Sequence, residues 1–354
     1  MVDVSSSFHR MQLPREIVVG SRILQLVGET CRRLGFTHSS LVLIGPYTHD
    51  IAGKTVIESL QNAGFRVTEL IIEQSNVATV ELLRKGIRKS KPSVVLGIGG
   101  GKVIDVAKLG SAEEGVPFVS VPTAASHDGI ASPRASIKDG DKSLSVEAQA
   151  PVAIIADTNV IIRSPYRLTA SGCGDIIAKY TSVRDWRLAH KLKGEYYGEY
   201  AASLALMCAR LVIRNAELIR RNVEESLRTV LEALISCGVA MGIAGSSRPC
   251  SGSEHLFSHA LDRLAPKSAL HGEQCGVGAI IMAYLHGANW KLVRDSLRTI
   301  GAPTTAKELG IEPNYVIEAL TIAHKIRPER YTILGENGLT RGAAERLALA
   351  TGVL

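Results

Sequence analysis

The stretch VVLGIGGGKVIDVAK, residues 94–108, joins an apolar run to a helical pattern through three consecutive glycines. Valine and isoleucine before the glycines favour a buried strand, and the apolar spacing after them favours a helix. Glycine lets a backbone approach a ligand closely, and the N-terminus of the following helix offers unpaired N–H groups to an anion. The stretch therefore predicts a strand, turn and helix that bind a phosphate or pyrophosphate, with an unliganded tight turn as the alternative.

Two better-known phosphate-binding motifs do not fit this spacing. A P-loop that ends on Lys102 would need glycine at position 96, where Leu96 stands. A G-x-G-x-x-G fingerprint that starts at Gly99 and Gly101 would need a third glycine at Ile104. The glycines also follow about the fourth predicted strand, whereas that fingerprint follows the first.

Strand and helix patterns alternate over the first 160 residues. Near-continuous apolar strands that alternate with helices indicate a parallel sheet covered on both faces, that is, a doubly wound α/β domain. After about Ser164 the β-branched runs end, and long stretches rich in alanine and leucine predict an all-helical domain. We therefore expect two domains, residues 1–163 and 164–354. The predicted strands are 15–20, 40–45, 66–72, 93–99, 117–122 and 152–157, and the predicted helices of the first domain are 23–34, 51–63, 78–89 and 103–111.

Composition narrows the possible partners of this 354-residue chain. Its net charge of +7 comes from basic residues interleaved with acidic ones, and only 5% of its residues are aromatic, which disfavours nucleic-acid binding and favours a small anionic substrate. We take Cys275–Leu285 as the longest uncharged apolar stretch, which is too short to cross a bilayer, so no transmembrane segment is predicted. The first 17 residues lack the pattern of a secretory signal, which predicts a cytoplasmic protein. Six cysteines without a C-x-x-C pair argue against a disulfide framework and against a thiolate zinc site, and predict reduced, buried thiols.

A second polar segment, VPTAASHDGIASPRASI at 121–137, follows the next predicted strand. Because the carboxyl ends of parallel strands share one edge of a sheet, this loop is expected beside the glycines, with hydroxyl groups for phosphate or ribose. A solvated loop would have a similar composition.

Polar residues of the helical half suggest a divalent metal. His255 and His259 are four residues apart and share one face of a helix, and Asp175 lies in a separate helical stretch. A carboxylate, two imidazoles and an open water position suit a catalytic zinc. Spacing alone pairs His255 with His259 and leaves the third ligand open. Other eligible histidines are His190, His271 and His286.

Five segments in this order, GGGKVIDVAK, PTAASHDG, GCGDIIAKY, GSEHLFSHALD and LHGEQCGVG, resemble the superfamily of iron-containing alcohol dehydrogenases and dehydroquinate synthases. The resemblance covers essentially the whole chain, and within the superfamily it is strongest to the archaeal sn-glycerol-1-phosphate dehydrogenases. It implies a dehydroquinate synthase-like fold: an N-terminal Rossmann-like sheet, an all-α C-terminal domain, and one zinc per subunit in the cleft between them. It also implies a homo-oligomer with an even number of subunits.

Carried over residue by residue, the resemblance implies that Asp175, His255 and His271 hold the metal, and that His259 faces the substrate instead. Asp128 and Asp175 would also contact the substrate, and Asp128 or His259 would relay a proton. Zinc is preferred over iron because the chain offers two metal histidines where iron alcohol dehydrogenases have three. Residues implied to meet the cofactor pyrophosphate are Gly99, Gly100, Gly101, Lys102, Val103, Ile104 and Asp105, and those implied on the nicotinamide side are Thr123, Ala124, Ala125, Ser126 and Ser132.

The implied activity is zinc-assisted, NAD(P)-dependent and reversible reduction of dihydroxyacetone phosphate to sn-glycerol 1-phosphate, which supplies the backbone of archaeal membrane phospholipids. The alternatives are a dehydrogenase of unphosphorylated glycerol and a nucleotide-binding regulatory module without catalysis. The second predicted strand is followed by no acid before Asp50, so nothing repels a 2′-phosphate and both NAD and NADP are expected to bind. Lys179, Arg248 and Lys267 lie near the metal motifs, but each is interpreted as a solvated surface residue, and the anchor of the substrate phosphate stays open.

Overall fold

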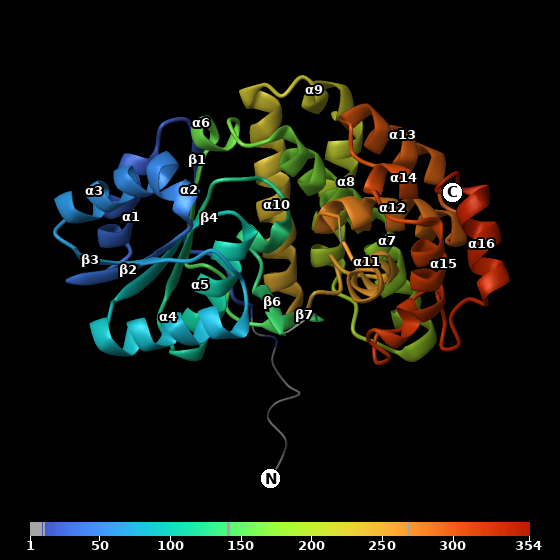
Figure 1. Ribbon diagram of the computed structural model, residues 1–354, viewed down its shortest axis with the longest axis horizontal. Helices are drawn as coiled ribbons and strands as arrows, with labels where there is room; N and C mark the ends of the chain where they lie inside the picture. Colours follow the sequence, from blue (N-terminus) through green and yellow to red (C-terminus); the bar gives the residue numbers. More distant parts are fainter. Residues whose placement is uncertain (1–8, 10, 140–141, 268) are drawn as a thin grey trace, which may run out of the picture.

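The computed structural model describes residues 9, 11–139, 142–267 and 269–354. Figure 1 shows a sheet flanked by helices beside a larger group of helices formed by the second half of the chain. Most of the amino-terminal stretch tested for a secretory signal, residues 1–8 and 10, lies outside the described residues.

The sheet has six strands in the order β1-β8-β5-β4-β2-β3, and every neighbouring pair is parallel. The predicted strands are confirmed, and the four inner ones are buried along their whole length, as their apolar sequences require. Their bounds are β1 (Glu16–Gly20), β2 (Ser39–Ile44), β3 (Arg66–Ile71), β4 (Val94–Gly99), β5 (Phe118–Pro122) and β8 (Ala153–Asp157).

Helices cover both faces of this sheet, as Figure 1 shows. Val42 and Ile44 of β2 pack with α1 and α3 on one face, whereas Leu41 and Leu43 pack with α4 and α5 on the other. This split follows from the alternation of side chains along a strand. The elements of this half, apart from the strands, are η2 (Leu24–Leu26), α1 (Val27–Arg33), α2 (Pro46–Thr48), η3 (His49–Gly53), α3 (Lys54–Asn62), α4 (Val77–Ser90), α5 (Gly101–Glu113), η4 (Asp128–Ile130) and α6 (Thr158–Ile161).

A two-stranded hairpin was missed by the sequence analysis. Strands β6 (Arg134–Asp139) and β7 (Lys142–Glu147) pair antiparallel, so the prediction of a loop over 121–137 is wrong from Arg134 onward. Ala135 and Ile137 are buried against α5, and they alternate with the polar residues Arg134 and Ser136. This strict alternation is the signature of a half-buried strand, which the polar composition concealed.

The second half contains helices and no strand among its described residues. A single large apolar core runs through it. Its helices are α7 (Tyr166–Lys193), α8 (Glu199–Arg214), α9 (Ala216–Arg220), α10 (Glu224–Ala244), α11 (Ser253–Leu264), α12 (His271–Leu285), α13 (Trp290–Ile300), α14 (Ala306–Leu309), α15 (Pro313–Ile322), η5 (Ala323–Lys325) and α16 (Arg341–Ala350). The boundary predicted at residues 163 and 164 falls between α6 and α7 and stays a prediction.

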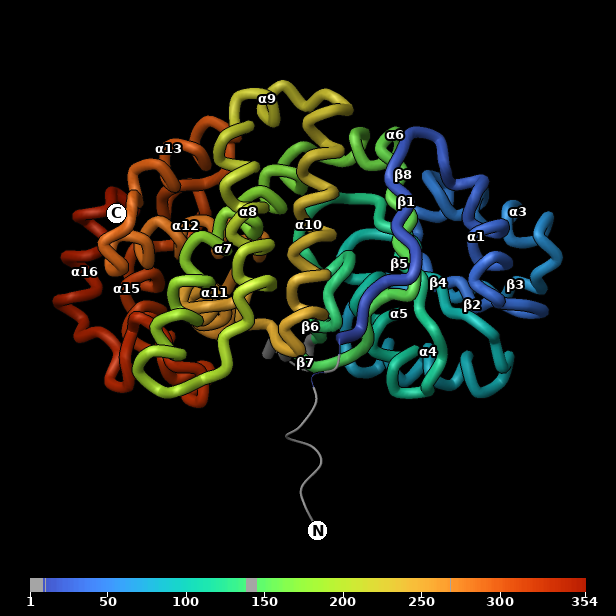
Figure 2. The backbone as a smooth tube through the Cα atoms, turned by 180° about the vertical axis from the view of Figure 1, so that it is seen from behind, coloured from blue at the N-terminus to red at the C-terminus, as the bar shows by residue number. Residues whose placement is uncertain are grey.

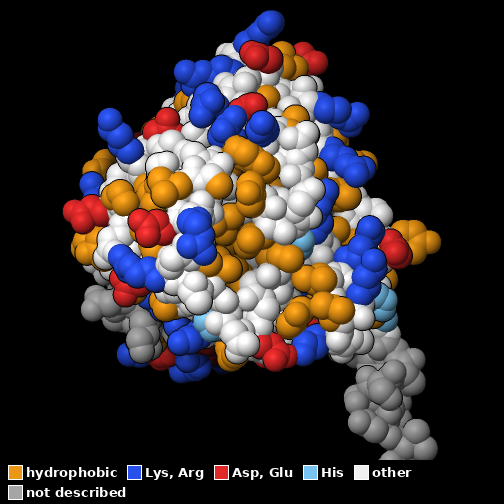
Figure 3. All heavy atoms as spheres, turned by 90° about the vertical axis from the view of Figure 1, so that its right-hand side faces the viewer, with side chains coloured by type: hydrophobic (Ala, Val, Ile, Leu, Met, Phe, Trp, Pro, Cys, Tyr) orange, Lys and Arg blue, Asp and Glu red, His pale blue; other side chains and the backbone are white. Residues whose placement is uncertain are grey.

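Helix α10 stands between the sheet and the other helices (Figure 2). Among the described residues, α10 is the one helix long and apolar enough to cross a membrane. Its uncharged apolar run at 233–244 is longer than Cys275–Leu285, so the prediction that Cys275–Leu285 is the longest such stretch is wrong. In the structure 67% of the most apolar window of α10 is buried inside the protein, as expected of a core helix. All six cysteines are free and buried, as predicted. On the side of the molecule where α16 lies, basic side chains are spread among acidic and apolar ones and form no single patch (Figure 3).

Candidate metal and dinucleotide site

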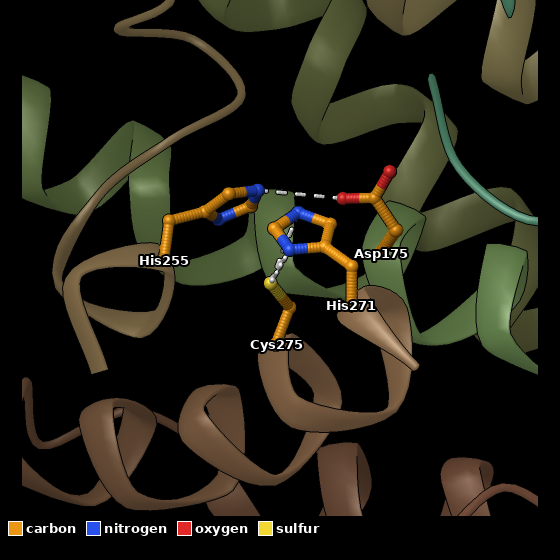
Figure 4. A group of neighbouring side chains, drawn as sticks. All are labelled: Asp175, His255, His271 and Cys275. Carbon is orange, nitrogen blue, oxygen red and sulfur yellow. Dashed lines mark hydrogen bonds and ion pairs between the residues drawn. The ribbon is translucent and has the colours of Figure 1, made fainter. Parts of the chain in front are cut away.

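Three helices bring Asp175, His255 and His271 together (Figure 4). Asp175 lies in the middle of α7, His255 in the first turn of α11, and His271 is the first residue of α12. One ligand atom from each, together with the sulfur of Cys275, lies within 4.8 Å of all the others. Asp175 Oδ1 is 3.5 Å from His255 Nε2, and the two imidazole rings have centroids 5.0 Å apart. Residues separated by almost a hundred positions thus form one cluster.

Glycines allow the close crossing of α7 and α12 that places Asp175 beside His271. A Cβ on Gly174 would lie 2.3 Å from the carbonyl oxygen of Gly272, and a Cβ on Gly272 would lie 1.9 Å from the carbonyl oxygen of Ser171. Neither contact is possible for real atoms, so both positions require glycine at this crossing. Each glycine neighbours a residue of the cluster in sequence, and the helix crossing therefore sets how far apart these side chains lie.

Cys275 joins the cluster without having been predicted. It stands four residues after His271 on α12, and its sulfur is 3.5 Å from His271 Nε2. The lack of a C-x-x-C pair argued against a thiolate ligand, but the i, i+4 spacing of His271 and Cys275 also brings a thiol to the cluster. That spacing places both side chains on one helix face.

His259 lies one turn after His255 on α11, as expected, but is not part of the cluster. Its ring stacks on that of His271 with centroids 5.8 Å apart. Its Nδ1 is buried, has no hydrogen-bond partner among the described residues, and lies 4.0 Å from Asp262 Oδ2. The geometry therefore groups His255 with Asp175 and His271, and leaves His259 facing the space beside them.

A buried lysine holds the two acidic residues of the site. Lys179 is fully buried, and its Nζ lies 2.5 Å from Asp175 Oδ1 and 2.8 Å from Asp128 Oδ2. The backbone N–H of Asp128 donates to Asp175 Oδ2 over 2.8 Å. The interpretation of Lys179 as a solvated residue is therefore wrong, because two carboxylates compensate its charge in the interior.

The same interpretation is wrong for Arg248 and fits Lys267. Arg248 is buried and bonds the carboxylate of Glu195, with its Nε 2.5 Å from Glu195 Oε1. Lys267 is exposed at the rim of the cavity described below. A lysine or arginine within a helix does not reveal its burial unless the position of its carboxylate partner is known.

His255 is oriented from behind by its neighbour Glu254. His255 Nδ1 and Glu254 Oε1 are 2.9 Å apart, and Glu254 is fully buried. Glu254 also accepts hydrogen bonds from Thr181 Oγ1 over 2.7 Å and from the backbone N–H of Gly252 over 2.7 Å. Asp185 accepts two further bonds from Ser253, which fixes the start of α11. The Nε2 of His255 is thereby left to face Asp175.

The electrostatics of the cluster favour positive charge. Burial opposes charge on every member, yet Lys179 and then His255 lower the pKa of Asp175 well below its ordinary value. Against the same burial, Cys275 and Asp175 raise the pKa of His271 to about 9. Histidines that hold protons beside an anionic carboxylate mark a place where a cation is stabilised. Imidazole, carboxylate and thiolate donors are the set that zinc prefers, so these residues fit a divalent metal.

The glycine loop lies where the sheet topology predicts. Gly99 at the end of β4 pairs with Pro122 at the end of β5, so the glycines and the 123–128 loop share one sheet edge. Gly100 precedes the first residue of α5, and a Cβ built on Gly100 would meet no atom within 4 Å. None of the three glycines has a positive φ. The role of Gly100 is therefore to keep space open in front of the N-terminus of α5.

His127 explains the third glycine. A Cβ on Gly101 would lie 2.1 Å from His127 Nε2. The backbone N–H of Gly129 donates to His127 Nδ1 over 3.0 Å, which holds the ring in place. Gly101 thus permits contact with a histidine, and Gly100 leaves room for a ligand.

One cavity of about 1680 Å³ lies against both sites. It opens between the carboxyl edge of the sheet and α11 and α12 of the helical half. Of the predicted metal and substrate residues, Asp128, His255, His259 and His271 line it, and Asp175 lies behind them. Of the predicted cofactor residues, Gly100, Gly101, Lys102, Asp105, Ala124, Ser126 and Ser132 line it, whereas Gly99, Val103, Ile104, Thr123 and Ala125 do not.

Asp105 has partners within the protein. Its Oδ1 lies 3.4 Å from Lys108 Nζ, and its Oδ2 accepts a hydrogen bond from the backbone N–H of Ser136 over 3.1 Å. Lys108 is fully buried and also donates to the carbonyl oxygens of Gly129 and Arg134, each over 2.6 Å. Both residues tie α5 to the hairpin.

Comparison with known proteins places the chain in a family. The family model of the iron-containing alcohol dehydrogenases matches residues 18–165. The chain is 57% identical over 345 residues to the glycerol-1-phosphate dehydrogenase [NAD(P)+] of Methanothermobacter thermautotrophicus, covering 98% of this chain and 99% of the relative. The chain belongs to the glycerol-1-phosphate dehydrogenase family.

A second member of the glycerol-1-phosphate dehydrogenase family, that of Thermococcus kodakarensis, is 58% identical over 349 residues, with 98% of this chain and 99% of that protein covered. Among solved structures, a glycerol dehydrogenase from Schizosaccharomyces pombe matches 97% of this chain and 90% of its own with a TM-score of 0.81 at 21% identity. The latter likeness shows a shared fold. The predicted resemblance and fold class are thereby confirmed.

Proposed function

We propose that this chain catalyses the reversible reduction of dihydroxyacetone phosphate to sn-glycerol 1-phosphate with NADH or NADPH. In the organisms of its relatives this product would supply the backbone of membrane phospholipids. The observation that carries the proposal is the position of the Asp175, His255 and His271 cluster in the wall of the cavity that the glycine loop also lines. Names of family members at 57% and 58% identity over nearly the full chain support the substrate and the dual cofactor.

Asp175, His255 and His271 would hold one divalent cation, for which we propose zinc. When bound, such an ion supplies Lewis acidity that polarises a carbonyl oxygen and stabilises developing negative charge. Glu254 keeps the Nδ1 of His255 occupied, so that its Nε2 faces the metal position. Cys275 is a candidate fourth donor from the same helix as His271.

The chain's own polar groups would orient the substrate and move the proton. The carboxylate of Asp128 faces the cavity and is held in place by Lys179 Nζ at 2.8 Å. From that position it can accept a hydrogen bond from a substrate hydroxyl. His259 Nδ1 has no hydrogen-bond partner among the described residues and can hold the proton that the alcohol gains or loses. The buried wall of α11 and α12 limits the access of water.

The dinucleotide would lie along the glycine loop. The open face of Gly100 and the N-terminus of α5 would take its pyrophosphate, and Ser126 and Ser132 would line the nicotinamide side. Asp50 pairs with Lys54 at 2.8 Å and lies beyond the end of β2, so no carboxylate at that strand end repels a 2′-phosphate. We infer that NAD and NADP are both accepted, by an even-numbered homo-oligomer in the cytoplasm.

An oxidation assay tests the proposal. Purified protein reconstituted with zinc should oxidise NADPH when dihydroxyacetone phosphate is added, and a chelator should abolish the rate. Chiral analysis should identify sn-glycerol 1-phosphate as the product. Faster oxidation of glycerol than of glycerol 1-phosphate under matched conditions would overturn this assignment in favour of a glycerol dehydrogenase. A metal-free protein with full activity would overturn the metal assignment.

A further inference from the structure

The proposed substrate carries a phosphomonoester, which needs cationic partners. Several basic side chains near the cavity are paired with a carboxylate, belong to the glycine loop or are exposed. Arg167 makes two hydrogen bonds to the carboxylate of Glu273, over 2.6 and 2.7 Å. Lys102 belongs to the glycine loop, and Lys267 is exposed. The substrate phosphate therefore needs a different anchor.

Two arginines meet in the cavity from opposite halves of the chain. Arg134 begins β6, and Arg327 follows η5, which packs against α11. The Nη2 of Arg134 donates to the carbonyl oxygen of Ser145 over 2.8 Å, and the Nη2 of Arg327 donates to the same oxygen over 3.5 Å. Both arginines line the same cavity as His259. One carbonyl thus holds two guanidinium groups side by side.

A third arginine completes the group. Arg330 donates from Nη1 to the carbonyl oxygen of Ser251 over 2.5 Å and from Nη2 to Ser247 Oγ over 2.8 Å. Both serines line the cavity. Arg330 comes from the same segment as Arg327 and reaches the start of α11, where the metal cluster begins.

Among the described residues, no carboxylate lies within 4.0 Å of these three guanidinium groups. Their hydrogen bonds go to neutral oxygens, and Glu147, Glu329 and Glu195 compensate their charge only from further away. Arg134 Nε is buried without a hydrogen-bond partner there, and so is the neighbouring His259 Nδ1. Burial, followed by Arg327 and other arginines, lowers the pKa of Arg330 to about 9. Burial also lowers the pKa of Arg327 and, with Arg327, that of Arg134.

Neighbouring guanidinium groups with unpaired N–H donors can form a binding site for a dianion. Guanidinium groups match the oxygens of a phosphate in a bidentate fashion, and such charge-assisted bonds are strong. Resting on the proposed function, we propose that Arg134 and Arg327 bind the phosphate of the substrate, while Arg330 adds positive charge behind them. The arginines would then select phosphorylated triose over the free triose.

The test compares two ketones that differ only in the phosphate. We expect Arg327→Gln to lower kcat/KM for dihydroxyacetone phosphate about 100-fold, mainly through KM, because one charge-assisted contact is lost. The same variant should retain kcat/KM for unphosphorylated dihydroxyacetone within about threefold of the parent protein. Arg327→Lys keeps the charge without the fork and should fall between the two. Arg298→Gln removes another arginine that lines the cavity, one that pairs with Asp295, and serves as the matched control.

Inorganic phosphate gives a readout that does not depend on turnover. Calorimetric titration should show phosphate binding to the parent protein and to Arg298→Gln, and binding at least tenfold weaker for Arg327→Gln. Equal losses on both ketones, or unchanged phosphate affinity in Arg327→Gln and Arg134→Gln, would overturn the proposal. A parent protein that binds phosphate through Arg327 but never reduces dihydroxyacetone phosphate would overturn the proposed function and leave the anion site standing.

Discussion

Replacing Lys179 with methionine should destabilise the metal-free protein far more than the metal-loaded protein. Lys179 Nζ lies 2.5 Å from Asp175 Oδ1 and 2.8 Å from Asp128 Oδ2, and the side chains of the two acids are only 1% and 15% exposed. Removal of the shared cation leaves both carboxylates in the interior without compensation. Breaking such a buried pair costs about 3–5 kcal/mol of unfolding free energy. Methionine fills a similar volume, so the added cost of a cavity is small.

The measurement is thermal unfolding of chelator-treated and zinc-loaded protein. For a chain of this size, a loss of this order lowers the Tm of the metal-free protein by roughly 4–7 °C. A bound divalent cation neutralises Asp175 in place of the ammonium group, so the zinc-loaded variant should lose about half as much or less. Zinc should also bind more tightly to Lys179→Met, because a like charge beside the metal position is gone, and the Tm gain on adding zinc should rise accordingly.

Lys108→Met is the matched control. Lys108 is equally buried, but it donates chiefly to the carbonyl oxygens of Gly129 and Arg134, and it lies outside the metal cluster. Its loss should lower the Tm by the same amount with and without zinc. The reasoning would be refuted if Lys179→Met showed this metal-independent pattern, or if metal-free Lys179→Met unfolded at the temperature of the parent protein.

Three further perturbations test the site and the fold. His271→Ala should lose bound zinc and turnover while the metal-free protein keeps its unfolding temperature within a few degrees; metal analysis, activity and calorimetry check this, and an active zinc-free variant would contradict it. Glu254→Gln weakens the bond to His255 Nδ1 and should reduce zinc affinity about 10- to 100-fold in a competitive chelator titration, and unchanged affinity would exclude this orienting role. Burial opposes negative charge on Glu308, but the hydrogen bonds that Glu308 accepts from Thr304 lower its pKa. The contribution of Glu308 to stability is therefore present above the unfolded pKa of about 4.3 and disappears as pH falls through the folded pKa. The drop in Tm between pH 7 and about pH 3 should therefore be smaller in Glu308→Gln than in the parent protein, and an identical drop would argue against it.

The sheet could be predicted from sequence because each inner strand is buried on both faces. A run such as VVLGIG at 94–99 has one stable environment, and turn residues mark where it ends. The hairpin of β6 and β7 was missed because its alternate residues are polar and follow a loop of similar composition. Its burial against α5 depends on a tertiary contact that local sequence does not reveal.

Residue spacing alone predicted only part of the candidate site. The i, i+4 pair of His255 and His259 lies on one helix, yet the fold brings His255 together with Asp175 of α7 and His271 of α12. Family resemblance gave the grouping that spacing could not. Cys275 had a usable signal, its i, i+4 relation to His271. Lys179 had none, because its two partners come from separate segments.

The arginines show that charged residues in a sequence likewise do not reveal which of them will lie together in the fold. Arg134 and Arg327 are 193 positions apart in the sequence, and each alone resembles an ordinary surface arginine. Only the fold shows that both donate to the carbonyl oxygen of Ser145. The positive net charge favoured an anionic substrate, but it could not predict where that substrate would bind.

The crossing of α7 and α12 at Gly174 and Gly272 makes the spacing of the metal position a property of the backbone. A single methyl group at either glycine would wedge the helices apart and move Asp175 away from His271, without altering any donor atom. Selection for a larger ion could therefore act at these two glycines as well as at the ligands themselves. Substitution at these glycines is therefore a way to change the ionic radius that the site accepts while the donor atoms stay the same.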